Sequence, residues 1–203
     1  MKKFAGIILL FLILNISFAV PVHNTNIALN KTVTGSAYYN SGSEIFEYFR
    51  IVDGSTYDGG SPSNWNFWLT PQSTTGWAMI NLGQVYNIGK IEFLNTHNRQ
   101  HNDRSTKDWK IEILSASQQV VHTITGMEND LNIGGTDPIP VTHVDLDSVY
   151  TGQYVKFTVV SFWGGSGGLN ELRVYESIAG NIPEVSSFVL ISCAAALLYF
   201  FKR

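Results

Sequence analysis

The sequence predicts an all-β sandwich or jelly roll, and two observations support this fold class. Apolar residues occur in short runs that alternate with polar residues, and turn-forming residues separate these runs. No segment carries a sustained helical stripe with caps, although residues 44–52 are compatible with one short helix. Many short strands without helix–strand alternation are typical of a sandwich or jelly roll.

The predicted strands follow one another from residue 77 onward. The clearest is 109–114, where apolar and polar residues alternate so that one face is buried and the other is wet. Residues 20–181 have the usual length of one domain. The predicted strands are 77–82, 88–94, 109–114, 120–124, 143–146, 154–160 and 169–175. The predicted turns are 81–84, 134–135, 137–138 and the glycine-rich run 164–168.

The composition excludes a general nucleic-acid binder. Charged residues make up 14% of the chain, and the net charge is −3. Setting the terminal segments aside leaves nine bases against fifteen acids, so residues 20–181 carry a charge of −6. Because the phosphate backbone attracts basic surfaces, we expect no nucleic-acid partner.

The first 19 residues have the pattern of a secretory signal peptide. Lys2 and Lys3 precede the apolar run 4–14, and small residues lead up to Ala19. This order predicts export with cleavage after Ala19. A membrane helix at the start of the chain is the alternative, but the apolar run is shorter than the roughly 20 residues of a typical span.

The C-terminal segment 182–203 predicts a membrane span. The apolar run 186–201 ends at Lys202-Arg203, and basic residues mark the cytoplasmic side of a span. Together with Pro183-Glu184 it resembles the PEP-CTERM sorting tail of bacterial exported proteins, although Val185 departs from the motif. The resemblance implies processing by an exosortase-type membrane peptidase; a plain membrane anchor is the alternative. Both place the body at the cell envelope or extracellular surface, and its lack of cysteine excludes a disulfide there.

Several short motifs in the body resemble the discoidin domain, also called the coagulation factor 5/8 type C domain. In order, they are Asn-Ile-Ala-Leu-Asn-Lys at 26–31, Ile-Val-Asp-Gly at 51–54, Trp65, 77–83, 88–91, 154–157 and 169–175. The resemblance covers residues 24–176 and implies a galactose-binding-like jelly roll. The family includes the family 32 carbohydrate-binding modules. Animal members often join their ends by a disulfide, so the missing cysteines favour the bacterial carbohydrate-binding branch.

The segment 53–63 is rich in oxygen donors and glycine, the residue types from which calcium sites are built. The family resemblance implies a structural Ca²⁺ held by the Asp of the Asp-Gly motif, a hydroxyl of the following loop and a Glu near the last strand. An Asp-Gly turn without a metal is the alternative. The candidate ligands are Asp53, Asp58, Ser63 and Glu171.

The segment 95–104 contains no apolar residue and lies between two predicted strands. Because loops expose their side chains, we expect this polar segment to be exposed and to serve recognition. Asn, Arg and His offer the directional donors and acceptors that sugar hydroxyls need, and an indole ring covers apolar sugar faces. The candidate ligand-binding residues are His97, Asn98, Arg99, His101, Arg104 and Trp163, with Trp65 as a second aromatic platform.

Two alternatives remain open for this segment. Arg104 is equally suited to a structural ion pair with Asp103 or Asp108. His97 and His101, with Asp103, are possible zinc ligands, but the segment lacks the helical character that would align two histidines.

The sequence predicts no catalytic residues, because no Gly-x-Ser-x-Gly elbow joins a strand to a helix. We therefore expect a non-catalytic, exported carbohydrate-binding module whose partner is a carbohydrate or extracellular polysaccharide. The alternatives are an adhesive envelope protein that binds another protein and an enzyme that uses the His-rich loop.

Overall fold

The structure is a computed structural model that describes residues 25–56, 66–134 and 138–177. The predicted signal peptide, the predicted C-terminal tail, Asp58, Ser63 and Trp65 lie outside these ranges. None of the helices within the described ranges has the length and hydropathy needed to cross a membrane.

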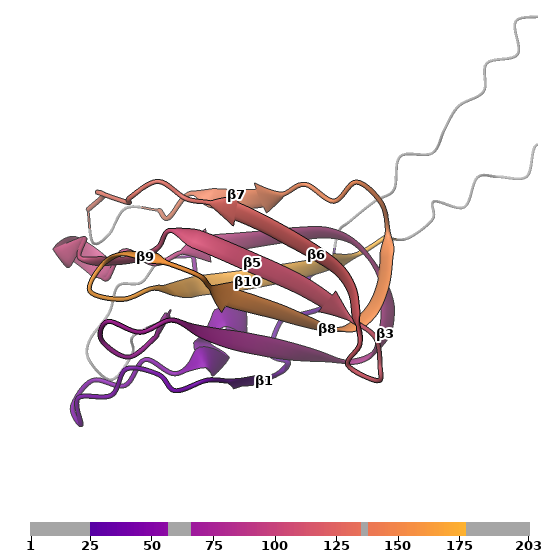
Figure 1. Cartoon of the computed structure of the whole chain (residues 1–203), viewed down its shortest axis with the longest axis horizontal. Helices are drawn as coiled ribbons and strands as arrows, with labels where there is room; N and C mark the ends of the chain where they lie inside the picture. Colours follow the sequence, from indigo (N-terminus) through magenta and orange to yellow (C-terminus); the bar gives the residue numbers. More distant parts are fainter. Residues whose placement is uncertain (1–24, 57–65, 135–137, 178–203) are drawn as a thin grey trace, which may run out of the picture. The chain divides into compact units, whose positions relative to one another are not determined.

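The described residues form an all-β sandwich, which confirms the predicted fold class (Figure 1). The short helix expected within 44–52 is the 3-10 helix η1 (Tyr48–Val52). The strands are β1 (Thr32–Gly35), β2 (Trp68–Leu69), β3 (Gly76–Asn95), β4 (Arg104–Thr106), β5 (Asp108–Leu114), β6 (Val120–Met127), β7 (Val141–Val144), β8 (Tyr150–Val159), β9 (Phe162–Gly164) and β10 (Gly168–Glu176). A second 3-10 helix, η3 (Arg99–His101), lies between β3 and β4.

Strand β3 belongs to both layers of the sandwich. Its first part pairs with β1 and β8, and its second part pairs with β10 and β7. The turn predicted at 81–84 is wrong, because the chain continues as one strand with a register shift between Asn81 and Tyr86. Gly83 has a φ of +91° in this irregular stretch. An isolated glycine in a strand pattern marks a bulge as readily as a turn.

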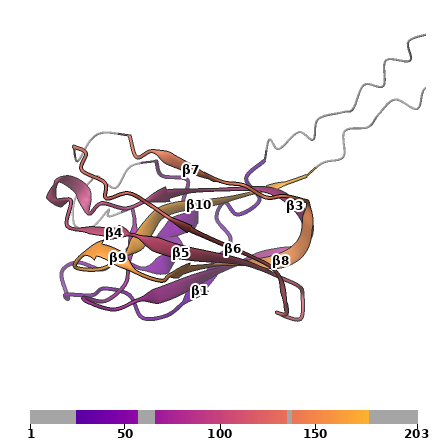
Figure 2. The ribbon, with the colours of Figure 1, turned by 45° about the horizontal axis from the view of Figure 1, so that its top comes forward.

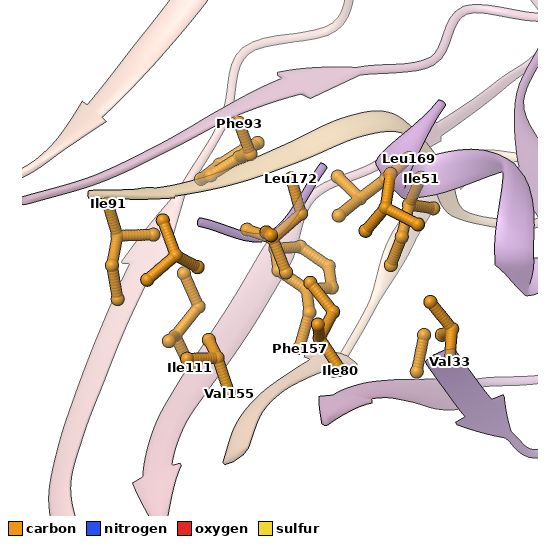
Figure 3. Close-up of a cluster of buried hydrophobic side chains, with 14 of the residues drawn as sticks. Val33, Ile51, Ile80, Ile91, Phe93, Ile111, Val155, Phe157, Leu169 and Leu172 are labelled. Carbon is orange, nitrogen blue, oxygen red and sulfur yellow. The ribbon is translucent and has the colours of Figure 1, made fainter. Parts of the chain in front are cut away.

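The core lies between the two layers and is closely packed (Figure 3). The ring of Phe93 meets both Trp109 and Phe157 edge-on, with centroids 5.2 and 5.3 Å apart. In β5 Trp109, Ile111 and Ile113 are buried, as the two-residue alternation predicts, and Leu114 at the end of the strand is buried as well. This core provides the rigid scaffold on which the loops are mounted.

Strands β4 and β9 form a separate two-stranded sheet beside the loops at one end of the sandwich (Figure 2). Buried side chains fasten it to the main sheet. The Asn95 side chain donates to the Thr106 carbonyl at 2.8 Å and accepts from the Thr106 N–H at 3.0 Å. The Thr106 hydroxyl in turn donates to the Gly168 carbonyl at 2.7 Å. Neither strand was predicted from the sequence, and each has only three residues.

Candidate functional site

The polar loop between β3 and β4 folds inward at its start. His97 is 1% exposed and Asn98 is 3% exposed, so the expectation that this loop exposes its side chains is wrong for these two residues. His97 Nδ1 donates to Asn102 Oδ1 at 2.9 Å, and the same oxygen accepts the Ile133 N–H at 3.2 Å. Buried polar groups need hydrogen-bond partners, and His97 and Asn102 provide them for each other inside the loop.

Hydrogen bonds brace the rest of the loop. Asn98 Nδ2 donates to Asp103 Oδ1 at 2.6 Å, and Arg99 Nη2 donates to Asn98 Oδ1 at 3.0 Å. Asn98, Arg99 and Asn102 all have a φ between +50° and +60°, a left-handed conformation that lets the chain turn tightly. His101 is exposed and Arg99 is half-buried, so these two side chains reach the surface.

The zinc alternative is not supported by this geometry. His97, His101 and Asp103 all lie in described ranges, and the described residues contain no group of three or more His, Cys, Asp or Glu placed to hold a metal ion. His97 and Asp103 instead hydrogen-bond to Asn102 and Asn98.

Arg104 lies in a cluster with side chains from two other loops. Its guanidinium carbon is 4.7 Å from the centroid of the Tyr39 ring, and Nη2 donates to Gln72 Oε1 at 3.3 Å. Gly165 makes room for this arrangement, because a Cβ there would lie 2.7 Å from Gln72 Nε2 and 3.4 Å from Arg104 Nε. We call Tyr39, Gln72, Arg104 and Gly165 the Arg104 cluster.

The structural ion pair considered for Arg104 is absent from the described residues. Asp103 accepts a hydrogen bond from Asn98, and Asp108 accepts one from Ser161, so neither carboxylate pairs with the guanidinium. Arg104 Nε is buried and has no hydrogen-bond partner among the described residues. The guanidinium is therefore held in place by a ring and an amide rather than by a counter-ion.

Trp163 is held by a different set of contacts. Its Nε1 donates to the Glu128 carbonyl at 3.1 Å, and Lys107 Nζ lies 4.5 Å from its ring centroid. The Glu128 carboxylate accepts from Trp109 Nε1 at 3.0 Å and from Thr142 Oγ1 at 2.8 Å. The indole is thus fixed, and an ammonium group already lies over its ring.

The structure separates the two candidate recognition elements. Arg104 pairs with Gly164, and its neighbour Ser105 pairs with Trp163. Because successive side chains of a strand point to opposite faces, Arg104 and Trp163 lie on opposite faces of the β4–β9 pair. The partners of Arg104 are Tyr39 and Gln72, which the local sequence pattern does not reveal because they lie far from residue 104 in the chain.

Glu171 is a fully buried carboxylate on β10. Its Oε2 accepts the Gly54 N–H at 3.2 Å, while Oε1 has no hydrogen-bond partner among the described residues. Burial, aided by the nearby charge of Asp53, raises the pKa of Glu171 to about 8. An ionised carboxylate in this position calls for a cation. Of the four candidate calcium ligands, only Asp53 and Glu171 lie in described ranges.

Comparison with known proteins identifies the fold. No family model and no curated protein matches the sequence. The lectin-binding domain of lectinolysin, solved with Lewis b, superposes with a TM-score of 0.58 at 21% identity, over 78% of this chain and 100% of that one. A fucose-binding module of Streptococcus pneumoniae gives 0.56 at 20% identity, over 76% of this chain and 100% of that one.

A family 32 carbohydrate-binding module from NanJ of C. perfringens, solved with galactose, gives a TM-score of 0.52 at 20% identity, over 72% of this chain and 94% of that one. The described body therefore has the fold of such lectin modules, as the discoidin resemblance implied. Membership of the discoidin family itself stays a prediction, as does the PEP-CTERM tail.

Proposed function

We propose that this chain is a non-catalytic carbohydrate-binding module that acts outside the cytoplasm. The observation that carries the proposal is the Arg104 cluster, which combines an aromatic ring, an amide and a guanidinium beside the loops of a lectin-like sandwich. An aromatic face suits the apolar side of a sugar, and planar nitrogen donors suit its hydroxyls.

In this proposal the residues of the β3–β4 loop have two kinds of role. Arg99 and His101, which reach the surface, contact the ligand together with Arg104. His97 and Asn98 are positioning residues, because they are buried and brace the loop through Asn102 and Asp103. Trp163 lies on the other face of the β4–β9 pair, where Glu128 fixes its indole, so its role is to position this pair of strands and not to contact the ligand at Arg104.

We further propose that Asp53 and Glu171, together with Asp58 and Ser63 of the sequence segment that follows Asp53, hold a structural Ca²⁺. The support is the buried Glu171 carboxylate, which has one oxygen without a partner in the described part of the chain and lies against the Gly54 backbone. Oxygen donors of this kind are the ligands that calcium prefers. The ion would supply a direct counter-charge and a partner for Oε1, without taking part in any reaction.

The place of action is also a proposal, based on the terminal segments. Residues 1–19 would direct export, and 182–203 would hold the body at the membrane until an exosortase-type peptidase processes the tail. A shallow sugar site binds weakly by itself. Many copies on one surface would raise the overall affinity through multivalency.

A glycan array tests the proposed function. We expect the purified full chain to bind a glycan saturably, and Arg104→Ala and Tyr39→Ala each to weaken that binding by about tenfold or more, because each removes a polar or stacking contact. Thr123→Ala, at an exposed position on β6, is the control and should bind like the wild type. Absence of saturable binding to any glycan, with or without Ca²⁺, would refute the proposal.

A further inference from the structure

Arg104 forms no ion pair within the described residues. The loops that supply Gln72 and Gly165, residues 70–75 and 164–168, contain no charged residue; the segment that supplies Tyr39 carries Glu44 and Glu47, and neither pairs with Arg104 in the described part of the chain. Asp103, its neighbour in sequence, directs Oδ1 to the Asn98 amide. Among the described residues, Arg104 contacts only neutral groups, namely the Gln72 amide and the Tyr39 ring.

The orientation of the guanidinium leaves one edge available. Nε is buried, and Nη2 uses one of its hydrogens on Gln72. Nη1 makes no hydrogen bond within the described ranges and is not among their fully buried atoms, so its hydrogens can donate to a ligand. The Nη1 and Nη2 groups together form the fork that binds a carboxylate through two parallel hydrogen bonds.

The packing fixes this fork before any ligand arrives. Stacking on Tyr39 and the hydrogen bond to Gln72 hold the guanidinium plane, and the missing side chain of Gly165 lets it lie close to the backbone. A side chain that is already ordered loses little conformational freedom on binding. A rigid guanidinium that forms no ion pair within the described residues is suited to an anionic ligand group.

We propose that the glycan recognised by the Arg104 cluster is acidic, and that Arg104 binds the carboxylate of a uronic acid residue in it. This inference rests on the proposed carbohydrate-binding function and specifies its ligand class. Gln72 and Tyr39 then serve as positioning residues that hold the guanidinium, in addition to any contact that they make with the sugar ring.

Calorimetric titration of the full chain with matched sugars tests this proposal. Oligosaccharides of galacturonate and glucuronate are compared with those of galactose and glucose, which differ only in the carboxylate. We expect one of the acidic forms to bind about tenfold or more tightly than its neutral counterpart at low ionic strength, because charge-assisted bidentate bonds are roughly twice as strong as neutral ones. The advantage should shrink at high salt.

Variants test whether Arg104 causes the preference for the acidic sugar. Arg104→Gln should abolish the preference for the acid, while Arg104→Lys, which keeps the charge but loses the fork, should retain only part of it. Lys31→Gln removes the same charge beside Gly83 and should leave the preference unchanged. Melting curves of the variants establish that they are folded, and the comparison of acid with neutral sugar on the wild type needs no variant.

The outcomes separate the two proposals. Equal or tighter binding of the neutral sugars, or a preference for the acid that survives Arg104→Gln, overturns the acidic-ligand inference and leaves carbohydrate binding intact. Preference for sulfated over carboxylated sugars also overturns the assignment to uronate. Binding to neither series nor to any other glycan overturns both proposals.

Discussion

Thr106→Val is expected to lower the free energy of unfolding by about 2–5 kcal/mol. The Thr106 side chain is fully buried, and its hydroxyl serves both backbone groups of Gly168 at once. It donates to the Gly168 carbonyl at 2.7 Å and accepts the Gly168 N–H at 3.0 Å. Valine has nearly the same shape but no hydroxyl, so both backbone groups lose this buried partner.

Thr158→Val provides the matched control. The Thr158 hydroxyl is also buried, but it has no hydrogen-bond partner among the described residues. The same chemical change there should be neutral or slightly stabilising, because it removes a buried polar group without orphaning another. Urea unfolding of both variants at one pH measures the difference. Equal losses of stability in the two variants would contradict the role assigned to Thr106.

Loss of the Thr106 hydroxyl in Thr106→Val should also weaken glycan binding. Thr106 fastens β4 to β10, and Arg104 lies at the other end of β4. The Asn95 side chain, which bonds both backbone groups of Thr106, would still hold the strand in part. We therefore expect a partial loss of affinity at temperatures well below the melting transition of the variant.

The sequence predicted the fold well because sandwich strands carry their pattern locally. Alternation at 109–114 and the apolar residues of 154–160 are visible without tertiary information; 109–114 lies within β5, and 154–160 lies within β8 except for its last residue. Strand β4 was missed because Arg104, Ser105 and Thr106 have no apolar pattern. Side-chain hydrogen bonds to Asn95 and Gly168 fix its place.

The candidate site was harder to predict for a physical reason. A polar loop has the same sequence pattern whether its side chains face water or each other, and in this structure His97 and Asn98 turn inward. The partners of Arg104 come from loops some thirty and sixty positions earlier in the chain. Only the folded sandwich brings Tyr39 and Gln72 to the guanidinium, so the local motif at 95–104 carries no sign of them.

Removal of Ca²⁺ by a chelator is expected to lower the melting temperature of the wild type by about ten degrees at pH 8 to 9, and to leave Glu171→Gln almost unchanged. Glu171 ionises in the folded state only above a pKa of about 8, against 4.5 in the unfolded chain. Burying the ionised carboxylate without a cation lowers the free energy of unfolding by about 3–5 kcal/mol. At a few degrees per kcal/mol in a domain of this size, the loss is easily measured.

The stability of the metal-free protein should fall as the pH rises. Because the pKa of Glu171 is raised on folding, the metal-free protein keeps this contribution to stability below about pH 4.5 and loses it as the pH rises to about 8. With Ca²⁺ present the slope should flatten, since the ion binds the ionised carboxylate and its stabilising effect grows with pH. Glu171→Gln should remove this slope in chelator.

Glu92→Gln is the control for Glu171→Gln. It tests whether the loss of any buried carboxylate changes the response of the melting temperature to Ca²⁺. Burial alone would raise the pKa of Glu92, but hydrogen bonds from Lys90 and Tyr175 outweigh it and lower the pKa. Those partners lie 2.5 and 3.0 Å from its carboxylate oxygens. Because Glu92 already has its counter-charge, its loss should destabilise the protein equally with and without Ca²⁺.

The decisive comparison is the stability of the wild type against that of Glu171→Gln. We expect the more stable of the two proteins to differ between chelator and saturating Ca²⁺. In chelator above pH 8, Glu171→Gln should be more stable than the wild type, since it removes a buried charge whose Oε1 has no hydrogen-bond partner in the described part of the chain and whose burial outweighs the attraction of Arg173. In saturating Ca²⁺ the wild type should be the more stable, because only it keeps the carboxylate ligand. Elemental analysis that finds no calcium, together with identical chelator responses of the two proteins, would show that Glu171 is a protonated core residue and that Asp53 and Gly54 form a turn without a metal.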